Sequence, residues 1–196
     1  MREAENIREV EALGIDWMGF IFWPKSSRYV SERPAYLPTR CKRVGVFVNE
    51  EVEQVKRIAD DYALDFIQLH GSESPDYVQR LRMVCGNSIV TIKAFNIATI
   101  EDLETTKAYE GIVDYFLFDT KGKCVGGNGE KFDWSVLDNY VDETPFLLSG
   151  GIGPDDAGRV KTFHHSKCIG IDLNSRFEVK PGMKDVTALA RFLEEL

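Results

Sequence analysis

Short apolar runs recur along the chain at a nearly regular interval. Continuous apolar runs of this length are typical of strands that are covered on both faces, as in a parallel sheet. The segments between the runs are long enough to hold one helix each. The pattern therefore predicts seven strands that alternate with helices, and the strands begin near Trp17, Val44, Phe66, Ile89, Tyr115, Phe146 and Ile169.

Start signals and apolar stripes mark several of the helices. Residues 1–13 predict a helix at the beginning of the chain, because their apolar positions recur every three residues. Asn49 is a candidate N-cap for the next helix, and Ser74 followed by Pro75 is a second cap signal. The last helix is predicted to bury one stripe, formed by Val186, Leu189, Ala190 and Leu193.

Repeated strand–helix units form either an open doubly wound sheet or a closed (βα)8 barrel, the TIM barrel. An open sheet collects its functional residues at one switch point, and its dinucleotide-binding form begins with a GxGxxG turn that is absent here. In this chain, residues capable of chemistry follow at least four predicted strands, which favours an α/β barrel in a single domain, residues 1–196. These residues are Gln68, His70, Asp119, Ser149 and Asp172.

The number of strands is one short of the eight in a closed barrel of this type. The shortfall lies at the N-terminus, where a helix stands with no strand before it. We therefore expect a barrel that lacks its first strand and contains seven of the eight. A genuine seven-stranded or open barrel is the alternative.

Composition and charge narrow the classes of partner. The chain has 196 residues, a net charge of −8 and a pI of about 5.0, which disfavours nucleic acid as a partner. No apolar run approaches the length of a membrane span. The four cysteines have neither CxxC pairing nor metal-ligand spacing, so we expect reduced thiols in a cytoplasmic protein.

The segment from Tyr115 to Trp134 is the most suggestive for catalysis. Its apolar run ends in a single carboxylate, Asp119, and a glycine-rich loop that includes Gly127 follows. α/β enzymes present an acid or a base in this way, at the C-terminal end of a strand beneath a loop. The alternative is that Asp119 only caps the loop.

Three other loops carry groups that suit an anionic ligand. Arg28 lies in a polar loop after the first run and can hold a carboxylate through two hydrogen bonds. The turn Ser149-Gly150-Gly151 allows backbone N–H groups to approach an anion. If one strand is missing at the front, this turn and residues 170–178 follow the seventh and eighth strands, which is the usual phosphate site of the barrel.

Several of these segments together resemble phosphoribosylanthranilate isomerase, the aldose–ketose isomerase of tryptophan biosynthesis. The resemblance runs in order along nearly the whole chain. The most distinctive segments are PKSSRYV (24–30), QLHG (68–71) and the loop GGNGEKFDW (126–134), beside VGVFVNE (44–50), FLFDT (116–120), LLSGGIGPDDA (147–157) and GIDLNSRFE (170–178).

The resemblance implies an Amadori rearrangement of N-(5-phosphoribosyl)anthranilate, with neither a metal nor an organic cofactor. It makes Asp119 the general acid, Arg28 the partner of the anthranilate carboxylate, and Gln68, His70 and Gly127 substrate-binding residues. His70 could equally be a structural histidine. The implied phosphate site consists of Ser149, Gly150, Gly151, Asn174, Ser175 and Arg176.

Two departures from the family pattern stand out. The family's general base is a cysteine on the first strand, in a motif that would precede Met1. We therefore expect residues 1–196 to convert the substrate poorly. Cys124 is an unsuitable substitute for that base. Arg176 replaces a family glycine. Arginine there either strains the backbone, if φ is positive, or adds a charge for the phosphate.

Two other function classes remain open. A different phosphate-binding barrel enzyme would share the phosphate loops, and a non-catalytic barrel that binds sugar phosphates would bind a product analogue without turnover. In all three cases the ligand is a small phosphorylated molecule. All three are also compatible with a homodimer.

Overall fold

The strands form one curled parallel sheet. The computed structural model describes residues 1–86, 89–120 and 133–196. Within them, seven parallel strands pair in sequential order, which confirms the predicted α/β fold and its seven strands. The strands are β1 (Trp17–Ile21), β2 (Lys42–Phe47), β3 (Phe66–Leu69), β4 (Val90–Asn96), β5 (Tyr115–Asp119), β6 (Phe146–Ser149) and β7 (Cys168–Ile171).

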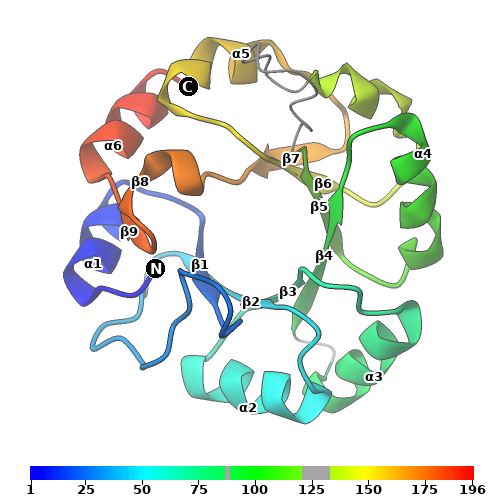
Figure 1. Cartoon of the computed structure of the whole chain (residues 1–196), viewed down its shortest axis with the longest axis horizontal. Helices are drawn as coiled ribbons and strands as arrows, with labels where there is room; N and C mark the ends of the chain where they lie inside the picture. Colours follow the sequence, from blue (N-terminus) through cyan, green and yellow to red (C-terminus); the bar gives the residue numbers. More distant parts are fainter. Residues whose placement is uncertain (87–88, 121–132) are drawn as a thin grey trace.

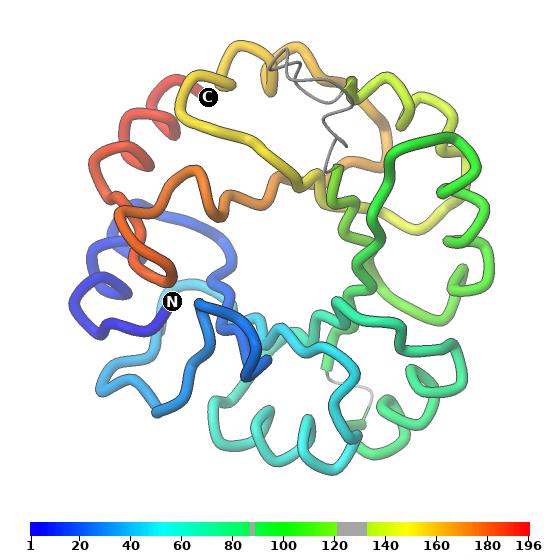
Figure 2. Tube along the Cα trace, in the orientation of Figure 1, coloured from blue at the N-terminus to red at the C-terminus, as the bar shows by residue number. Residues whose placement is uncertain are grey.

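Helices surround this sheet, as the ring in Figure 1 shows, and the chain trace in Figure 2 follows the same circuit. The α-helices are α1 (Ala4–Ala12), α2 (Val52–Tyr62), α3 (Pro75–Cys85), α4 (Ile100–Leu103), α5 (Ala157–Thr162) and α6 (Val186–Glu194). Short 3-10 helices complete the circuit: η1 (Glu104–Tyr109), η2 (Trp134–Asn139), η3 (Pro154–Asp156) and η4 (Ser175–Phe177).

The two faces of the sheet bury separate apolar clusters. The larger cluster lies between strands and helices, and the smaller one fills the inside of the curl with Val44, Phe66, Ile92, Ala94, Leu117 and Leu147. Side chains two positions apart share a face of a strand. Gln68, Asp119 and Ser149 each follow a member of the inner cluster by two positions, so these polar groups stand at one end of the curled interior.

Helix caps follow the sequence signals only in part. The Ser74 hydroxyl accepts a hydrogen bond from the Tyr77 N–H at 3.2 Å, as predicted. The prediction that Asn49 caps α2 is wrong, because the N-cap is Glu51 and Asn49 has a positive φ of 51°. The Asn49 side chain instead accepts a hydrogen bond from the Ser72 N–H at 2.8 Å and ties two loops together. In α6, Phe192 is buried beside Leu189, whereas Leu193 is only partly buried.

A small antiparallel hairpin, β8 (Glu178–Lys180) with β9 (Met183–Lys184), was not predicted. It lies beside the N-terminal segment, on the side of the ring between β7 and β1 (Figure 1). Asn6 of α1 holds it through both halves of its amide: Nδ2 donates to the Lys184 carbonyl at 2.9 Å, and Oδ1 accepts from the Lys184 N–H at 2.8 Å. Among the named strands of the described residues, β1 pairs with β2 alone and β7 with β6 alone, and Ile21 of β1 also forms an isolated bridge with Tyr29.

Candidate active site

Asp119 is the last residue of β5, and its carboxylate is nearly buried, with 5% of the residue exposed. The register places it beside Ser149 of β6 and Asn96 of β4. The next residue, Thr120, donates its N–H and its hydroxyl to the Ser149 carbonyl, at 3.0 and 2.8 Å. The strand end that carries the candidate acid is therefore fixed to the Ser-Gly-Gly turn.

His70 brings a second titratable group to Asp119. Its Nε2 lies 4.0 Å from Oδ2 of Asp119, and its Nδ1 lies 2.9 Å from the amide nitrogen of Gln68. An amide nitrogen only donates, so Nδ1 accepts, and a neutral ring then carries its proton on Nε2, toward the carboxylate. The structure thus joins Gln68 and His70 from the end of β3 with Asp119, as the sequence predicted.

The Ser-Gly-Gly turn requires glycine at its centre. Gly150 and Gly151 have φ values of +101° and +68°, which residues with a side chain rarely adopt. A Cβ atom on Gly150 would lie 2.5 Å from the Thr120 nitrogen and 2.9 Å from Oδ1 of Asp119. The turn predicted to bind phosphate therefore passes directly against the candidate acid.

Ser149 has a partner within the protein. Its hydroxyl donates to Oδ2 of Asp172 at 2.8 Å, and Asp172 stands just beyond β7. Because that hydroxyl proton is used by a carboxylate, Ser149 retains only acceptor lone pairs and cannot donate to an anion while this bond persists. An anion on this turn would rely instead on backbone N–H groups.

Arg176 is not strained. Among the described residues, Asn49 and Ala63 are the non-glycine residues with positive φ, so of the two alternatives for Arg176 the strained backbone does not apply. The Arg176 Nε lies 3.3 Å from where a Cβ on Gly153 would stand, which brings its side chain from η4 to the end of the Ser-Gly-Gly turn. Asn174 and Ser175 stand beside it at the start of η4 and are exposed.

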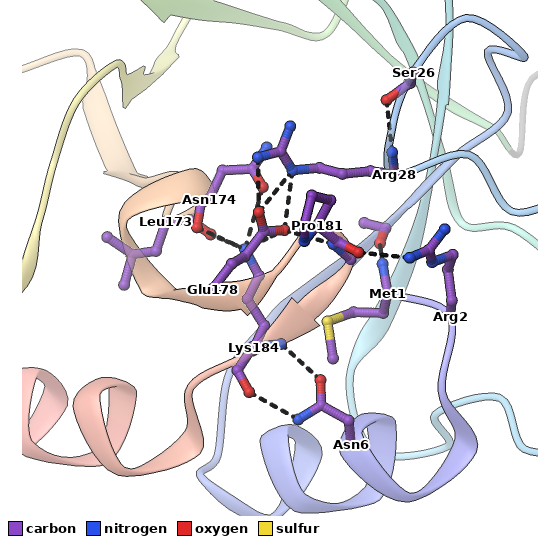
Figure 3. Close-up of polar contacts among 12 residues, drawn as sticks. Met1, Arg2, Asn6, Ser26, Arg28, Leu173, Asn174, Glu178, Pro181 and Lys184 are labelled. Carbon is purple, nitrogen blue, oxygen red and sulfur yellow. Dashed lines mark hydrogen bonds and ion pairs between the residues drawn. The ribbon is translucent and has the colours of Figure 1, made fainter.

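Arg28 contacts a carboxylate of the protein itself, as Figure 3 shows. Its Nε donates to Glu178 at 2.8 and 3.0 Å, and its Nη2 lies 2.7 Å from the same group. Lys184 lies on the other side of Glu178, with Nζ 3.8 Å from Oε1. Glu178 and Lys184 were not predicted as site residues, and the only signal for them in the sequence was their place in the loop beyond the predicted seventh strand.

Charge in this cluster is nearly balanced. Burial alone would raise the pKa of Glu178, but Arg28, Lys184 and the Gly182 N–H outweigh it and hold that pKa below its ordinary value. Burial lowers the pKa of Lys184, and the carboxylates of Glu178 and Asp172 offset only part of that effect. Asp172 also accepts a hydrogen bond from Ser149, so the carboxylate that acts on Lys184 contacts the Ser-Gly-Gly turn as well.

A family model described as N-(5'phosphoribosyl)anthranilate (PRA) isomerase matches residues 1–195. The chain belongs to this family. A curated N-(5'-phosphoribosyl)anthranilate isomerase from Parabacteroides distasonis is 50% identical over 202 residues, covering all of this chain and 90% of the relative.

Solved structures of PRA isomerases share the fold. The enzyme from Thermotoga maritima is 31% identical, with a TM-score of 0.80, over all of this chain and 94% of that one. A PRA isomerase in complex with reduced 1-(o-carboxyphenylamino)-1-deoxyribulose 5-phosphate is 28% identical, with a TM-score of 0.77, over all of this chain and 97% of that one. These matches place the seven-stranded sheet among PRA isomerase barrels. The expected loss of a first strand is not borne out by the comparisons.

Other features of this PRA isomerase chain lie outside the site. A cavity of about 710 Å³ occupies the opposite end of the strands and is lined by residues such as Asp16, Lys42 and Asp65. No described helix is long and apolar enough to cross a membrane, and the described residues contain no cluster of three His, Cys, Asp or Glu arranged for a metal ion. Gly127 and Cys124 lie outside the described residues.

Proposed function

We propose that this chain is an aldose–ketose isomerase of tryptophan biosynthesis. It converts N-(5-phosphoribosyl)anthranilate to 1-(2-carboxyphenylamino)-1-deoxyribulose 5-phosphate by an Amadori rearrangement. Membership of the PRA isomerase family supports this reaction. The single structural observation that carries it is the close approach of the Asp119 carboxylate to the Ser-Gly-Gly turn, because this approach places an acid next to a candidate phosphate site.

Asp119 acts as the general acid. It protonates the furanose ring oxygen, and the ring opens to an iminium at C1′. A general base, which the family resemblance implies to be a cysteine, takes the C2′ proton, and the resulting enolamine tautomerises to the ketone. Asp119 is held by β5 and by the bonds of Thr120 to Ser149, so its position is fixed before the substrate binds. His70 and Gln68 order the carboxylate from the side of β3.

The phosphate group binds at the turn after β6. Gly150 and Gly151 present backbone N–H groups there, and the loop of Asn174 and Ser175 closes the site from the end of β7. Arg176 adds a positive charge beside Gly153. Ser149 contributes through its backbone, because its hydroxyl already donates to Asp172.

Arg28 recognises the anthranilate carboxylate, and Gly127 contributes from the glycine-rich loop. Two N–H groups of one guanidinium match the two oxygens of a carboxylate, which a lysine cannot imitate. The reaction uses groups of the protein and requires neither a metal ion nor an organic cofactor. A cytoplasmic location and a homodimer stay predictions, as does the reduced turnover expected from the sequence.

The test is an assay of the purified chain with phosphoribosylanthranilate. We expect formation of the ribulose product above the uncatalysed rate, and competitive inhibition by the reduced product analogue. Binding of the analogue without any product would favour the non-catalytic sugar-phosphate binder. Absence of both binding and product would contradict the proposed function.

A further inference from the structure

The guanidinium of Arg28 is only partly used within the protein. Of its five N–H groups, those on Nε and on one side of Nη2 face Glu178 (Figure 3). One N–H group of Nη1 and the second one of Nη2 point to the same side and form another edge, and the Arg28 side chain is 25% exposed. That edge has the spacing that a second carboxylate needs.

Glu178 is the fixed member of the pair. Its side chain is only 4% exposed, and it accepts a hydrogen bond from the Gly182 N–H at 3.1 Å within the β8–β9 hairpin. The hairpin is itself tied to α1 through Asn6. A carboxylate anchored in this way is not readily displaced by a ligand, whereas the end of the longer and more exposed Arg28 depends on it for orientation.

Lys184 supplies a positive charge that reduces the repulsion between Glu178 and a second carboxylate. Without it, a substrate carboxylate on Arg28 would place two negative charges around one cation. Lys184, whose Nζ lies 3.8 Å from Oε1 of Glu178, adds a second cation beside Glu178 when a ligand carboxylate binds, and Asp172 offsets part of its charge. Lys184 is also secured without Glu178, because its Nζ donates to the carbonyls of Leu173 and Asn174 at 3.0 Å each.

We propose that Glu178 is a positioning residue for carboxylate recognition: it turns Arg28 so that the Nη1 edge faces the anthranilate carboxylate of the substrate. This proposal rests on the proposed function. It concerns discrimination between ligands with and without that carboxylate. The phosphate end of the ligand depends on the Ser-Gly-Gly turn and on residues 174–176, whereas the described partners of the Glu178 carboxylate are Arg28, Gly182 and Lys184.

The experiment compares two ligands on the full chain by titration calorimetry. One is the reduced product analogue, and the other is the same molecule with hydrogen in place of the ring carboxylate. For wild type we expect tighter binding of the first. In Glu178→Gln, affinity for the carboxylate ligand should fall about 10-fold or more, the scale of a hydrogen bond to a charged group. Affinity for the other ligand should change less than about threefold.

Matched variants separate positioning from a merely structural role. Glu178→Asp retains the charge but shortens the reach, so discrimination should fall between wild type and Glu178→Gln. Arg28→Lys should lose discrimination on its own, and adding Glu178→Gln to it should then change little, because both act through one contact. Glu143→Gln, which breaks an exposed pair with Lys167, is the control and should leave both affinities unchanged.

Three results would overturn the inference. One is unchanged discrimination in Glu178→Gln or Glu178→Asp. The second is an equal loss of affinity for both ligands, which indicates a structural role alone. The third is additivity of the two substitutions in the double variant. Wild-type protein that binds neither ligand would instead overturn the proposed function, so the two failures are distinguishable.

Discussion

Two ion-pair networks flank the candidate site, and they use the same chemistry differently. On the side of β3 and β4, Lys93 and Glu73 lie 3.4 Å apart, with side chains 3% and 1% exposed. Lys93 also donates to the carbonyls of Gly71 and Ala94, at 2.7 and 3.1 Å. Glu73 accepts from the N–H groups of Asn49 and Gly71. We call this pair the closed network.

Arg28, Glu178 and Lys184 form the open network on the side of β1. Its carboxylate is as deeply buried as the closed pair, but its guanidinium is one-quarter exposed and keeps an unoccupied edge within the contacts described. Burial of a charged side chain therefore does not identify a ligand-binding group. Hydrogen-bond donors that are exposed and have no partner among the described contacts are a better indication of a ligand-binding group.

Removal of the lysine from the closed network should have the largest effect on stability. Lys93→Met leaves the Glu73 carboxylate buried without its cation, and we expect a loss of about 3–5 kcal/mol in the free energy of unfolding. Urea denaturation measures it. The matched control, Lys107→Met, breaks an exposed pair with Glu104 and should change little. A loss below about 1 kcal/mol for Lys93→Met would show that the closed network is not structural.

Substitutions in the Ser-Gly-Gly turn, which lies between the two networks, should have the next largest effect on stability. Gly150→Ala combines an unfavourable φ with a Cβ only 2.5 Å from a backbone nitrogen, so we expect a loss of about 2–4 kcal/mol. Gly151→Ala is a close control, because its φ is also positive but its Cβ would meet nothing within 4 Å. It should cost about 1–2 kcal/mol. Equal losses in thermal melts would contradict the close approach at Gly150.

The contribution of the open network to the free energy of unfolding should decrease at acidic pH. The pKa of Glu178 lies below its ordinary value of 4.5, so its contribution to stability is present above pH 4.5 and is lost as the pH falls through the folded-state pKa. Wild type should therefore exceed Glu178→Gln in stability at neutral pH, and the gap should shrink in acid. Urea midpoints at a series of pH values measure the gap. A gap that does not vary with pH would contradict the ion pair.

The smallest effect is expected for a pair that belongs to neither network. Lys167 and Glu143 meet at the surface, where the Glu143 side chain is 84% exposed. Water and salt screen such a pair, so Glu143→Gln should change the free energy of unfolding by less than about 0.5 kcal/mol. Denaturation in low and high salt measures this change. A loss above about 1 kcal/mol in the free energy of unfolding would show that exposure does not distinguish weak ion pairs from strong ones.

The sequence predicts the parts of this molecule that repeat. The central strands bury both faces and each of the seven carries its own apolar signal, so seven strands, the end of β5 at Asp119 and the glycine turn after β6 are all predictable. The carboxyl ends of parallel strands meet at one edge, which is why Asp119, His70 and Ser149 could be grouped without coordinates.

Contacts that depend on long-range geometry could not be predicted in this way. Arg28 and Glu178 are 150 positions apart, and the hairpin that holds Glu178 is too short to leave a periodic signal. Lys93 interrupts an apolar strand, but nothing local identifies Glu73 as its partner. For Arg176, sequence alone left strain and phosphate binding as alternatives, and only the backbone angles removed the first.

The role proposed for Asp119 is that of the acid that opens the ribose ring beside the phosphate turn. The most direct measurement is the single-turnover rate of phosphoribosylanthranilate consumption by wild type and by Asp119→Asn, with analogue affinity measured on both. The rate should be lower by about 10²–10⁴ in the variant, with the affinity for the analogue changed less than about threefold. Equal rates at saturating substrate would contradict it.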